Sequence, residues 1–265
     1  MKHSYLMESD EELFRLELKT DEEPVNKQAL WAGIKPGMRV ADIGCGPGKT
    51  TFFLNRLIQP GGSIVGIDSS QERIIHARET YAGDSIEFLC KDFTEPFENI
   101  GSFDFIWVRF VLEYFYHEQF DIVKNCKQIL KPGGILCLID LDSNCLRISP
   151  LSERMEKSMA GMIDLLQQKL NFDPYVGINL YSFLYDLGFK DISVKVDVHN
   201  LIYGDIEKKV MFNWMKKVEI ASEKSGYHFD EYPDGKEGFI KEFKSFFCDQ
   251  RRFSYTPLIM CKGSK

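Results

Sequence analysis

The sequence predicts an α/β fold, in which a doubly wound sheet of seven strands ends in an antiparallel strand pair and carries a helical cap. Three observations lead to this prediction. Short apolar runs alternate with helical stretches over the first 140 residues, a pattern typical of βαβ crossovers and a parallel sheet covered on both faces. A glycine-rich turn directly follows the first apolar run. Two late strand-like segments flank a long helical stretch and suit an antiparallel pair at the sheet edge.

Two helices are expected before the sheet. Residues 8–19 place apolar side chains among charged ones, and Ser9 followed by Glu12 is a capping box. Residues 24–33 should form the second helix. The parallel strands are then expected at residues 38–43, 63–67, 85–89, 103–108 and 135–139, and the helices between them at 50–58, 71–81 and 120–130.

The second half of the chain is mainly helical. Helices are expected at residues 151–170 and 176–187, and again over 204–250, where Gly226 and the turn at 232–235 interrupt them. The late strands are expected at 192–201 and 253–261. The first of these alternates, with Ile192, Val194, Val196 and Val198 on one side.

The composition limits the classes of partner that the protein can have. The 265 residues are 44% hydrophobic and 28% charged, which is ordinary for a globular chain with a large core. The formal charge of −7, from 33 basic and 40 acidic side chains, disfavours a nucleic-acid partner, whose phosphates need clustered cations. The longest apolar runs, 103–112 and 133–139, are far shorter than the roughly 20 residues that span a bilayer, so no membrane partner is expected.

The cysteines indicate a reducing compartment. There are seven, an odd number, and no two form a C-x-x-C motif. The N-terminal residues run into acidic side chains rather than an apolar signal segment. We therefore expect a cytoplasmic location, with neither a disulfide framework nor a zinc site.

The densest functional signal is the turn from Asp42 to Thr50. Glycines at positions 44, 46 and 48 come off a predicted strand and open a predicted helix, which suits close approach of a nucleotide-like ligand to the backbone. A Walker A loop is excluded, because it would need glycine where Ile43 stands. A dinucleotide site would need glycine where Lys49 stands, so NAD or FAD is weakened but stays open.

The third candidate ligand for this turn is S-adenosylmethionine. The string Asp42-x-Gly44-x-Gly46-x-Gly48 resembles motif I of the class I S-adenosylmethionine-dependent methyltransferases, whose sheet is Rossmann-like. Three further segments resemble that family's motifs in the same order. They are residues 66–70 after the second strand, Lys91-Asp92-Phe93 after the third, and the turn at 130–134 before the fifth.

The resemblance implies donor-binding roles for individual residues. Asp68 would grip the ribose diol, and Asp92 would reach the adenine amino group. Asp42 would accept hydrogen bonds from loop N–H groups and from the donor's methionine amine. An alternative for Asp68 is capping of the next helix, and for Asp92 a solvated loop acid. The full expected set for the donor is Asp42, Gly44, Cys45, Gly46, Gly48, Asp68, Ser69, Asp92, Phe93, Arg109, Tyr5 and Arg15.

Three members of that set rest on weaker arguments. Arg109 emerges from an apolar strand and would meet the donor's carboxylate end, or else pair with a structural acid. Tyr5 and Arg15 lie in a stretch that resembles a lid helix found in some of these enzymes, where Tyr and Arg close over the methionine moiety.

The acceptor is expected to be a small molecule. The Asn-Pro-Pro-Tyr-like motif of DNA base methylases is absent after the fourth strand, where Val108 to Tyr114 stand. Methyl transfer mainly needs alignment and desolvation, so no catalytic residue is assigned; the general-base candidates are Asp140, Asp142, His117 and His199. No metal site is expected. The aromatic side chains of the cap would either line a pocket for an aromatic or hydrophobic acceptor or form the cap's own core.

The resemblance and the element pattern together predict one methyltransferase domain over residues 1–265, transferring a methyl group to oxygen, nitrogen or carbon. The alternatives are a non-catalytic module that binds S-adenosylmethionine or a partner, and an NAD-binding oxidoreductase. The expected parts are N-terminal lid helices at 1–35, the donor-binding core at 36–142, helical cap insertions at 143–187 and 203–250, and the late strand pair at 188–202 and 251–262.

Overall fold

The computed structural model describes residues 16–17, 20–144 and 146–265, and it confirms the predicted fold class. The strands are β1 (Arg39–Ile43), β2 (Ser63–Asp68), β3 (Ile86–Cys90), β4 (Phe103–Arg109), β5 (Leu130–Leu141), β6 (Ile148–Ser149), β7 (Lys190–Tyr203) and β8 (Phe253–Ser264). They form one sheet in the order β3-β2-β1-β4-β5-β8-β6, with β7 also paired to β8. β1 to β5 are parallel, and β8 runs antiparallel to β5, β6 and β7. The two-residue β6 is the addition to the seven predicted strands, because so short a segment has no periodicity to detect.

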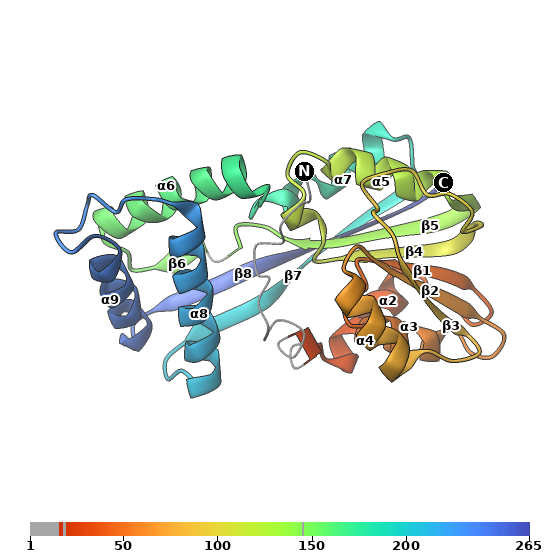
Figure 1. The fold of residues 1–265 in the computed structure, drawn as a ribbon, viewed down its shortest axis with the longest axis horizontal. Coiled ribbons are helices and arrows are strands. Elements are labelled where there is room, and N and C mark those ends of the chain that lie inside the picture. The colour runs from red at the N-terminus through yellow and green to blue at the C-terminus, as the bar shows by residue number, and fades with distance from the viewer. Residues whose placement is uncertain (1–15, 18–19, 145) are drawn as a thin grey trace.

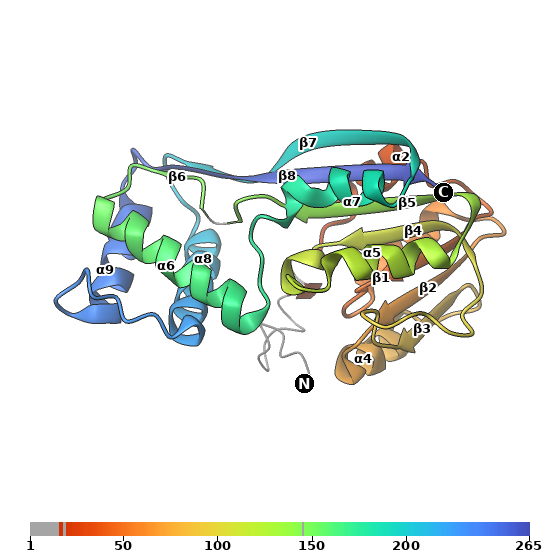
Figure 2. The same cartoon turned by 90° about the horizontal axis from the view of Figure 1, so that it is seen from above.

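Helices cover both faces of the sheet, as Figures 1 and 2 show. One face carries α2, α3 and α4, and the other carries α5 and α7. The helices are α2 (Glu22–Ala32), α3 (Lys49–Leu57), α4 (Gln71–Tyr81), α5 (Gln119–Gln128), α6 (Glu153–Leu170), α7 (Leu180–Asp186), α8 (Lys208–Ser225) and α9 (Gly235–Cys248), with 3-10 turns η1 (Leu112–Tyr114) and η2 (Val176–Asn179).

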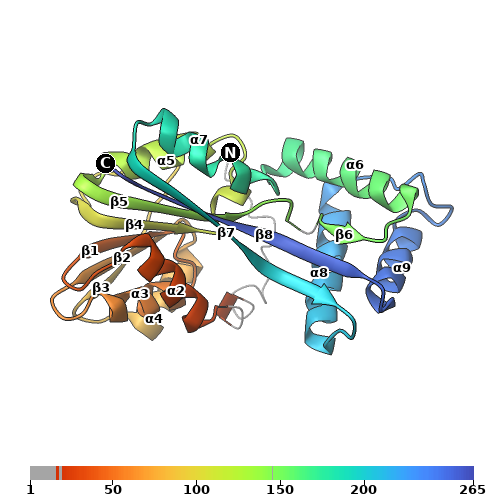
Figure 3. The same ribbon diagram turned by 180° about the vertical axis from the view of Figure 1, so that it is seen from behind.

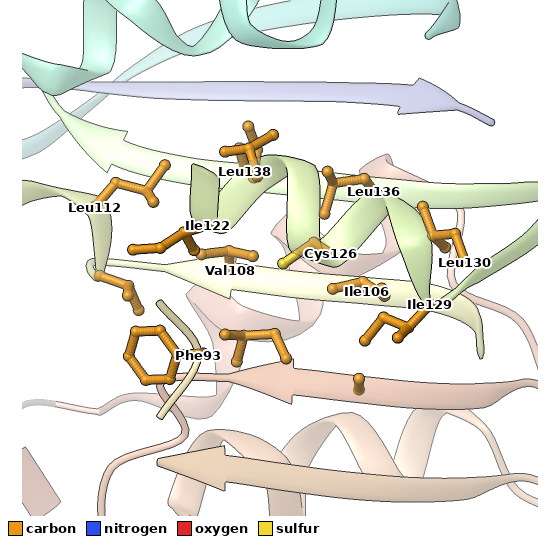
Figure 4. Close-up of a cluster of buried hydrophobic side chains, with 14 of the residues drawn as sticks. Phe93, Ile106, Val108, Leu112, Ile122, Cys126, Ile129, Leu130, Leu136 and Leu138 are labelled. Atoms are coloured by element: carbon orange, nitrogen blue, oxygen red, sulfur yellow. The ribbon is translucent and has the colours of Figure 1, made fainter. Parts of the chain in front are cut away.

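The alternation of side chains along the central strands builds two hydrophobic cores. Phe105 and Trp107 of β4 point to the α2–α4 face, whereas Ile106 and Val108 point to the α5–α7 face. Figure 4 shows the second of these cores, in which Ile106 and Val108 lie near side chains of β5 and α5. Because both faces are buried, β4 reads in the sequence as an almost unbroken apolar run.

The predicted turn at residues 131–134 is part of β5 in the structure. Phe103 of β4 pairs with Leu130, but Phe105 pairs with Ile135, so β5 carries extra residues over two positions of β4. This is a bulge rather than a separate turn. Gly133, with a φ of +75°, takes the left-handed conformation that glycine adopts readily.

The cap is built from β6, α6, α8 and α9 and lies beyond the carboxyl ends of β4 and β5, as Figures 1 and 3 show. The long β7 and β8 run from the core into it. Its interior is a third, mostly aromatic core, formed by Phe172, Trp214, Phe229, Tyr232, Phe239, Phe243, Phe246 and Phe247 with aliphatic side chains. Most of the cap's buried aromatic side chains therefore serve its own packing. Among the described residues, no helix is long and apolar enough to cross a membrane.

Candidate functional site

The sheet order brings the predicted donor-binding residues to one edge. β1 lies between β2 and β4, so the chain runs outward from β1 through β2 to β3 and then crosses back to β4 on the other side of β1. We call this switch point, between the glycine loop and the carboxyl ends of β2 and β4, the crevice. Asp68 ends β2, Arg109 ends β4, and the glycine loop follows β1 directly. The cap faces the same edge (Figure 1). This is the usual position of a ligand site in an open α/β sheet.

The three loop glycines differ in what surrounds them. All have positive φ, at +71° for Gly44, +56° for Gly46 and +97° for Gly48. A Cβ on Gly44 would lie 2.3 Å from Cγ2 of Val111, and a Cβ on Gly48 would lie 2.9 Å from the Phe88 ring. These two glycines allow tight packing within the protein.

Gly46 is packed less tightly by the described residues. Among these, the nearest atom to a Cβ placed on it is Cδ1 of Leu16, at 3.8 Å. Its N–H donates to Oδ2 of Asp68 at 2.9 Å, which fixes the loop against the end of β2. The loop backbone at Gly46 therefore forms a shallow cradle that a side chain would fill, and this is the form expected where a ligand approaches the backbone closely.

Asp68 is buried, and its carboxylate holds two loops together. Oδ2 accepts the Gly46 N–H, Oδ1 accepts the Ser70 N–H at 2.9 Å, and a guanidinium nitrogen of Arg73 lies 3.7 Å from Oδ1. The helix-capping alternative is not what the structure has, because Ser70 caps α4 by accepting the Arg73 N–H. Each carboxylate oxygen has a second lone pair that can accept from a diol. Ser69 is exposed beside it.

Asp42 has a different partner from the one predicted. Its buried Oδ2 accepts from the Thr51 hydroxyl at 2.6 Å. The loop amides at 44 and 45 donate to Ile67 O, and the amide at 46 donates to Asp68. Burial raises the pKa of Asp42 from its ordinary 3.8 to about 7, although the Thr51 hydrogen bond and the nearby Arg109 charge oppose the rise.

Arg109 ends β4 and contacts α2. Its Nε donates to the Gln28 side-chain oxygen at 3.0 Å, and its guanidinium lies 4.1 Å above the centre of the Phe110 ring. Burial lowers the pKa of Arg109 to about 10, while Asp42, Asp140 and Asp21 act against that shift. The guanidinium is thus a cation beside the crevice. An anionic group bound there would lower the free-energy cost of burying the guanidinium.

Asp92, predicted to reach the adenine, and its neighbour Phe93 of the expected donor set have different surroundings. Asp92 is exposed, and its Oδ1 accepts from the Thr94 N–H and hydroxyl in a local turn. Phe93 is buried, with its ring 5.2 Å from that of Phe115. The contribution of Asp92 to a ligand stays a prediction.

Glu113 in η1 is the main residue that sequence reasoning missed; it forms a buried acid pair with the predicted candidate Asp140 near the end of β5. Oδ2 of Asp140 accepts the N–H groups of Leu112 and Glu113, and Oδ1 accepts the Leu141 N–H. The buried Glu113 carboxylate accepts from the Asn144 side chain at 2.7 Å. Burial, and then the Glu113 charge, raise the pKa of Asp140 well above its ordinary value. An acid inside the apolar 110–115 segment was the available signal.

The other general-base candidates lie apart from this pair. His117 is exposed in the turn before α5, where its ring contacts Tyr116. His199 is exposed on β7, and its ring centre lies 5.0 Å from that of Phe110. Asp142 lies at the exit of β5, with its carboxylate 3.2 Å from the Ser143 hydroxyl. Within the described residues, no cluster of three or more metal-ligating side chains is present.

The N-terminal chain reaches the glycine loop at Glu17. Its carbonyl accepts from Lys49 Nζ at 2.6 Å, and its carboxylate accepts from the Tyr81 hydroxyl at 2.9 Å. The predicted donor contacts Tyr5 and Arg15 lie outside the described residues.

Fold and site together define a doubly wound α/β protein with a glycine loop at the carboxyl end of β1 and a cap beyond the same edge of the sheet. Residues 41–138 match the family model described as a methyltransferase domain. The predicted relationship is therefore confirmed, and this segment is a domain of the class I methyltransferase family.

One curated relative shares part of the sequence, and two solved structures share the fold. The chain is 31% identical over 109 residues to a demethylmenaquinone methyltransferase of Staphylococcus aureus, covering 40% of this chain and 44% of that protein. It spans between 33% and 55% of the length of the curated relatives that it matches first. In structure, it resembles the Haemonchus contortus phosphoethanolamine N-methyltransferase 2, with a TM-score of 0.62, 16% identity, and coverage of 97% of this chain and 57% of that one. It also resembles the [4+2]-cyclase SpnF, with a TM-score of 0.53, 18% identity, and coverage of 91% and 80%.

Proposed function

We propose that the protein is an S-adenosylmethionine-dependent methyltransferase acting on a small-molecule acceptor. The observation that carries the proposal is the open face of Gly46 beside the buried carboxylate of Asp68. A nucleoside with its ribose diol against Asp68 would pass over the backbone at Gly46, where any side chain would collide. When bound, the donor supplies a methyl group on an already activated sulfonium.

The protein's own part in the reaction is alignment and exclusion of water. We propose that Asp42 and Arg109 face the amino and carboxylate ends of the donor, since one is an acid and the other a cation beside the crevice. The remaining donor contacts in this proposal are Gly44, Cys45, Gly46, Gly48, Asp68, Ser69, Asp92 and Phe93. Tyr5 and Arg15 stay in the proposal as lid residues.

Asp140 fits the role of a positioning residue better than that of a general base. Its oxygens accept three backbone N–H groups, and burial with the nearby Glu113 charge raises its pKa well above the ordinary value, so the carboxyl is committed to holding this backbone. It thereby fixes η1, which lies between the crevice and the cap. We propose that the acceptor enters between η1 and the cap, beside Glu113 and Asn144, and that it is mainly hydrophobic or aromatic.

The two methyltransferases found by the comparisons support a small-molecule acceptor but do not identify the acceptor of this protein. The S. aureus relative acts on demethylmenaquinone, and the H. contortus neighbour on phosphorylated ethanolamines. Both acceptors are small molecules of different chemistry. The cyclase neighbour has the same fold and a different reaction, so the fold alone does not require methyl transfer. A cytoplasmic location is part of the proposal, supported by the six described cysteines, all of which are free thiols.

The test combines binding with turnover. By calorimetry, S-adenosylmethionine and S-adenosylhomocysteine should bind with micromolar affinity, whereas NAD should give no heat. A screen of phenols, quinols, amines and carboxylic acids should then yield acceptor-dependent release of S-adenosylhomocysteine.

Two outcomes would decide for the alternatives. Tight NAD binding without binding of the other two ligands would establish the oxidoreductase. A binding module would be established by two results together. The protein would bind the donor without turnover on any acceptor, and side chains would fill the space beside the sulfur in a donor-bound structure.

The raised pKa of Asp42 predicts a pH dependence of donor binding. Because burial favours the neutral acid, this group lowers the free energy of unfolding as the pH rises from about 4, where the unfolded carboxyl ionises, to about 7. An ammonium group of the donor favours the ionised form instead. Donor affinity should therefore rise about tenfold between pH 5.5 and pH 7, measured by calorimetry.

The variant Asp42→Asn is the control for this prediction. It should bind the donor more weakly, and with an affinity that stays flat over the same pH range. A wild-type affinity independent of pH would show that Asp42 does not face the donor's ammonium group.

A further inference from the structure

The outer edge of β7 is an open, apolar border of the sheet. β7 pairs with β8 along one side, and no described strand pairs with its other side. Figure 2 shows β7 at this border. Val194, Val196 and Val198 share one face of the strand and are 47%, 64% and 48% exposed. Exposed valines on a long free edge are unusual, because native sheets normally protect such edges.

Helix α7 extends this apolar surface. Phe183 lies on the α5 side of α7, where its ring contacts Phe120 at 6.0 Å. Tyr181 and Tyr185, one turn apart, lie on the opposite flank, toward β7, and their rings stack at 6.0 Å. They are 49% and 65% exposed. We call these two tyrosines and the three valines the β7 patch.

The backbone of this edge points outward, and the Val198 N–H, now bound to the Asp197 carboxylate, would exchange it for a carbonyl of the partner on pairing. The Val198 N–H donates to the Asp197 carboxylate at 2.9 Å and thus points away from β8. Because N–H and C=O groups alternate along a strand with a period of two, those of Val194 and Val196 point to the same free side. The register of β7 with β8 is unbroken from Ser193 to Val198, between two irregularities.

We propose that the β7 patch binds a second copy of this chain, through antiparallel pairing of β7 with the partner's β7. A twofold axis perpendicular to the joined sheet must pass midway between one residue of β7 and the same residue of the partner, because opposed side chains lie on the same face. We name each possible axis by that residue. An axis through Lys195 or Asp197 would set identical charges against each other. An axis through Val196 sets Lys195 against the partner's Asp197, and Asp197 against the partner's Lys195.

The same register also pairs the valine side chains and the outward backbone groups of this edge. Val196 meets the partner's Val196, and Val194 meets the partner's Val198, all at positions whose backbone groups point outward. The α7 helices of the two copies lie on one face of the joined sheet, so Tyr181 and Tyr185 flank the paired valines. The proposal is independent of methyl transfer, because it uses no residue of the glycine-loop crevice.

Charge reversal tests this register. Lys195→Asp, and separately Asp197→Lys, should raise the dimer dissociation constant about tenfold, because each replaces two opposed pairs by like charges. The double variant Lys195→Asp/Asp197→Lys should restore the wild-type constant. Sedimentation equilibrium measures these constants, and thermal unfolding verifies that each variant is folded. Lys27→Asp on α2, also an exposed lysine, is the matched control and should leave the constant unchanged.

Three results would overturn the proposal. They are a wild-type protein that stays monomeric at every concentration, a dimer indifferent to both single reversals, and a double variant as weak as the singles. The last would mean that the charges matter but do not oppose each other in this register.

Discussion

Asp68→Ala should weaken S-adenosylmethionine binding by about tenfold to a hundredfold. In our proposal, the ribose diol donates to a buried carboxylate, and hydrogen bonds to a charged acceptor contribute roughly 1.5–3 kcal/mol. The variant removes that acceptor and leaves the ligand's hydroxyls without a charged partner. It also removes the acceptor of the Gly46 and Ser70 amides, so the glycine loop loses its anchor to β2. Calorimetry with the donor measures the effect.

A matched variant separates binding from folding. Ser70→Ala removes the cap of α4, which costs about 1 kcal/mol of stability, but leaves the Asp68 carboxylate in place. It should lower the unfolding temperature and leave donor affinity nearly unchanged. If Asp68→Ala kept wild-type affinity while its unfolding temperature fell like that of Ser70→Ala, Asp68 would be a structural residue only.

The parallel half of the fold was predictable because the apolar pattern that forms it repeats over short stretches of the sequence. β1, β2, β4 and the helices that follow them each bury a face, so the apolar period is present in the chain. The bulge at residues 131–134 was not predictable in the same way. Its glycines suggest a turn, and only pairing with Phe103 and Phe105 makes the segment part of β5.

The site was predictable in position but less so in partners. Parallel strands bring Asp68 and the glycine loop together at one edge, so topology alone places them. Whether Asp42 meets loop amides or Thr51 depends on side-chain packing between β1 and α3, which no sequence period encodes. The Glu113–Asn144 contact joins η1 to the exit of β5, two segments 31 positions apart. A single sequence holds no signal for such a pair, and the roles of these residues toward a ligand stay predictions.

The cap illustrates a different limit. Its aromatic richness fitted both an acceptor pocket and an internal core. In the structure, Phe172, Trp214 and Phe229 are buried in the cap's own core, whereas Tyr203 and Phe212 are exposed. Composition cannot separate these outcomes, because a buried aromatic ring has the same hydrophobic character in either setting.

Gly46→Asn should abolish or strongly weaken donor binding in a protein that remains folded. Asparagine tolerates the left-handed φ of +56° better than other side chains do, so the backbone cost is small. In the part of the chain that the structure describes, no atom lies closer than 3.8 Å to its Cβ. The side chain would instead occupy the cradle proposed for the donor. Steric overpacking of this kind costs about 1–3 kcal/mol, or about tenfold to a hundredfold in affinity.

Gly48→Ala provides the contrast that makes this result specific. Its Cβ would lie 2.9 Å from both the Ala77 Cβ and the Phe88 ring, so this variant should lose stability first, as a lower unfolding temperature. Gly46→Asn should show the reverse order, with donor binding lost and the unfolding temperature close to wild type. If Gly46→Asn bound S-adenosylmethionine as tightly as the wild type, no ligand would pass over this backbone. The proposed donor site would then have to lie elsewhere along the crevice.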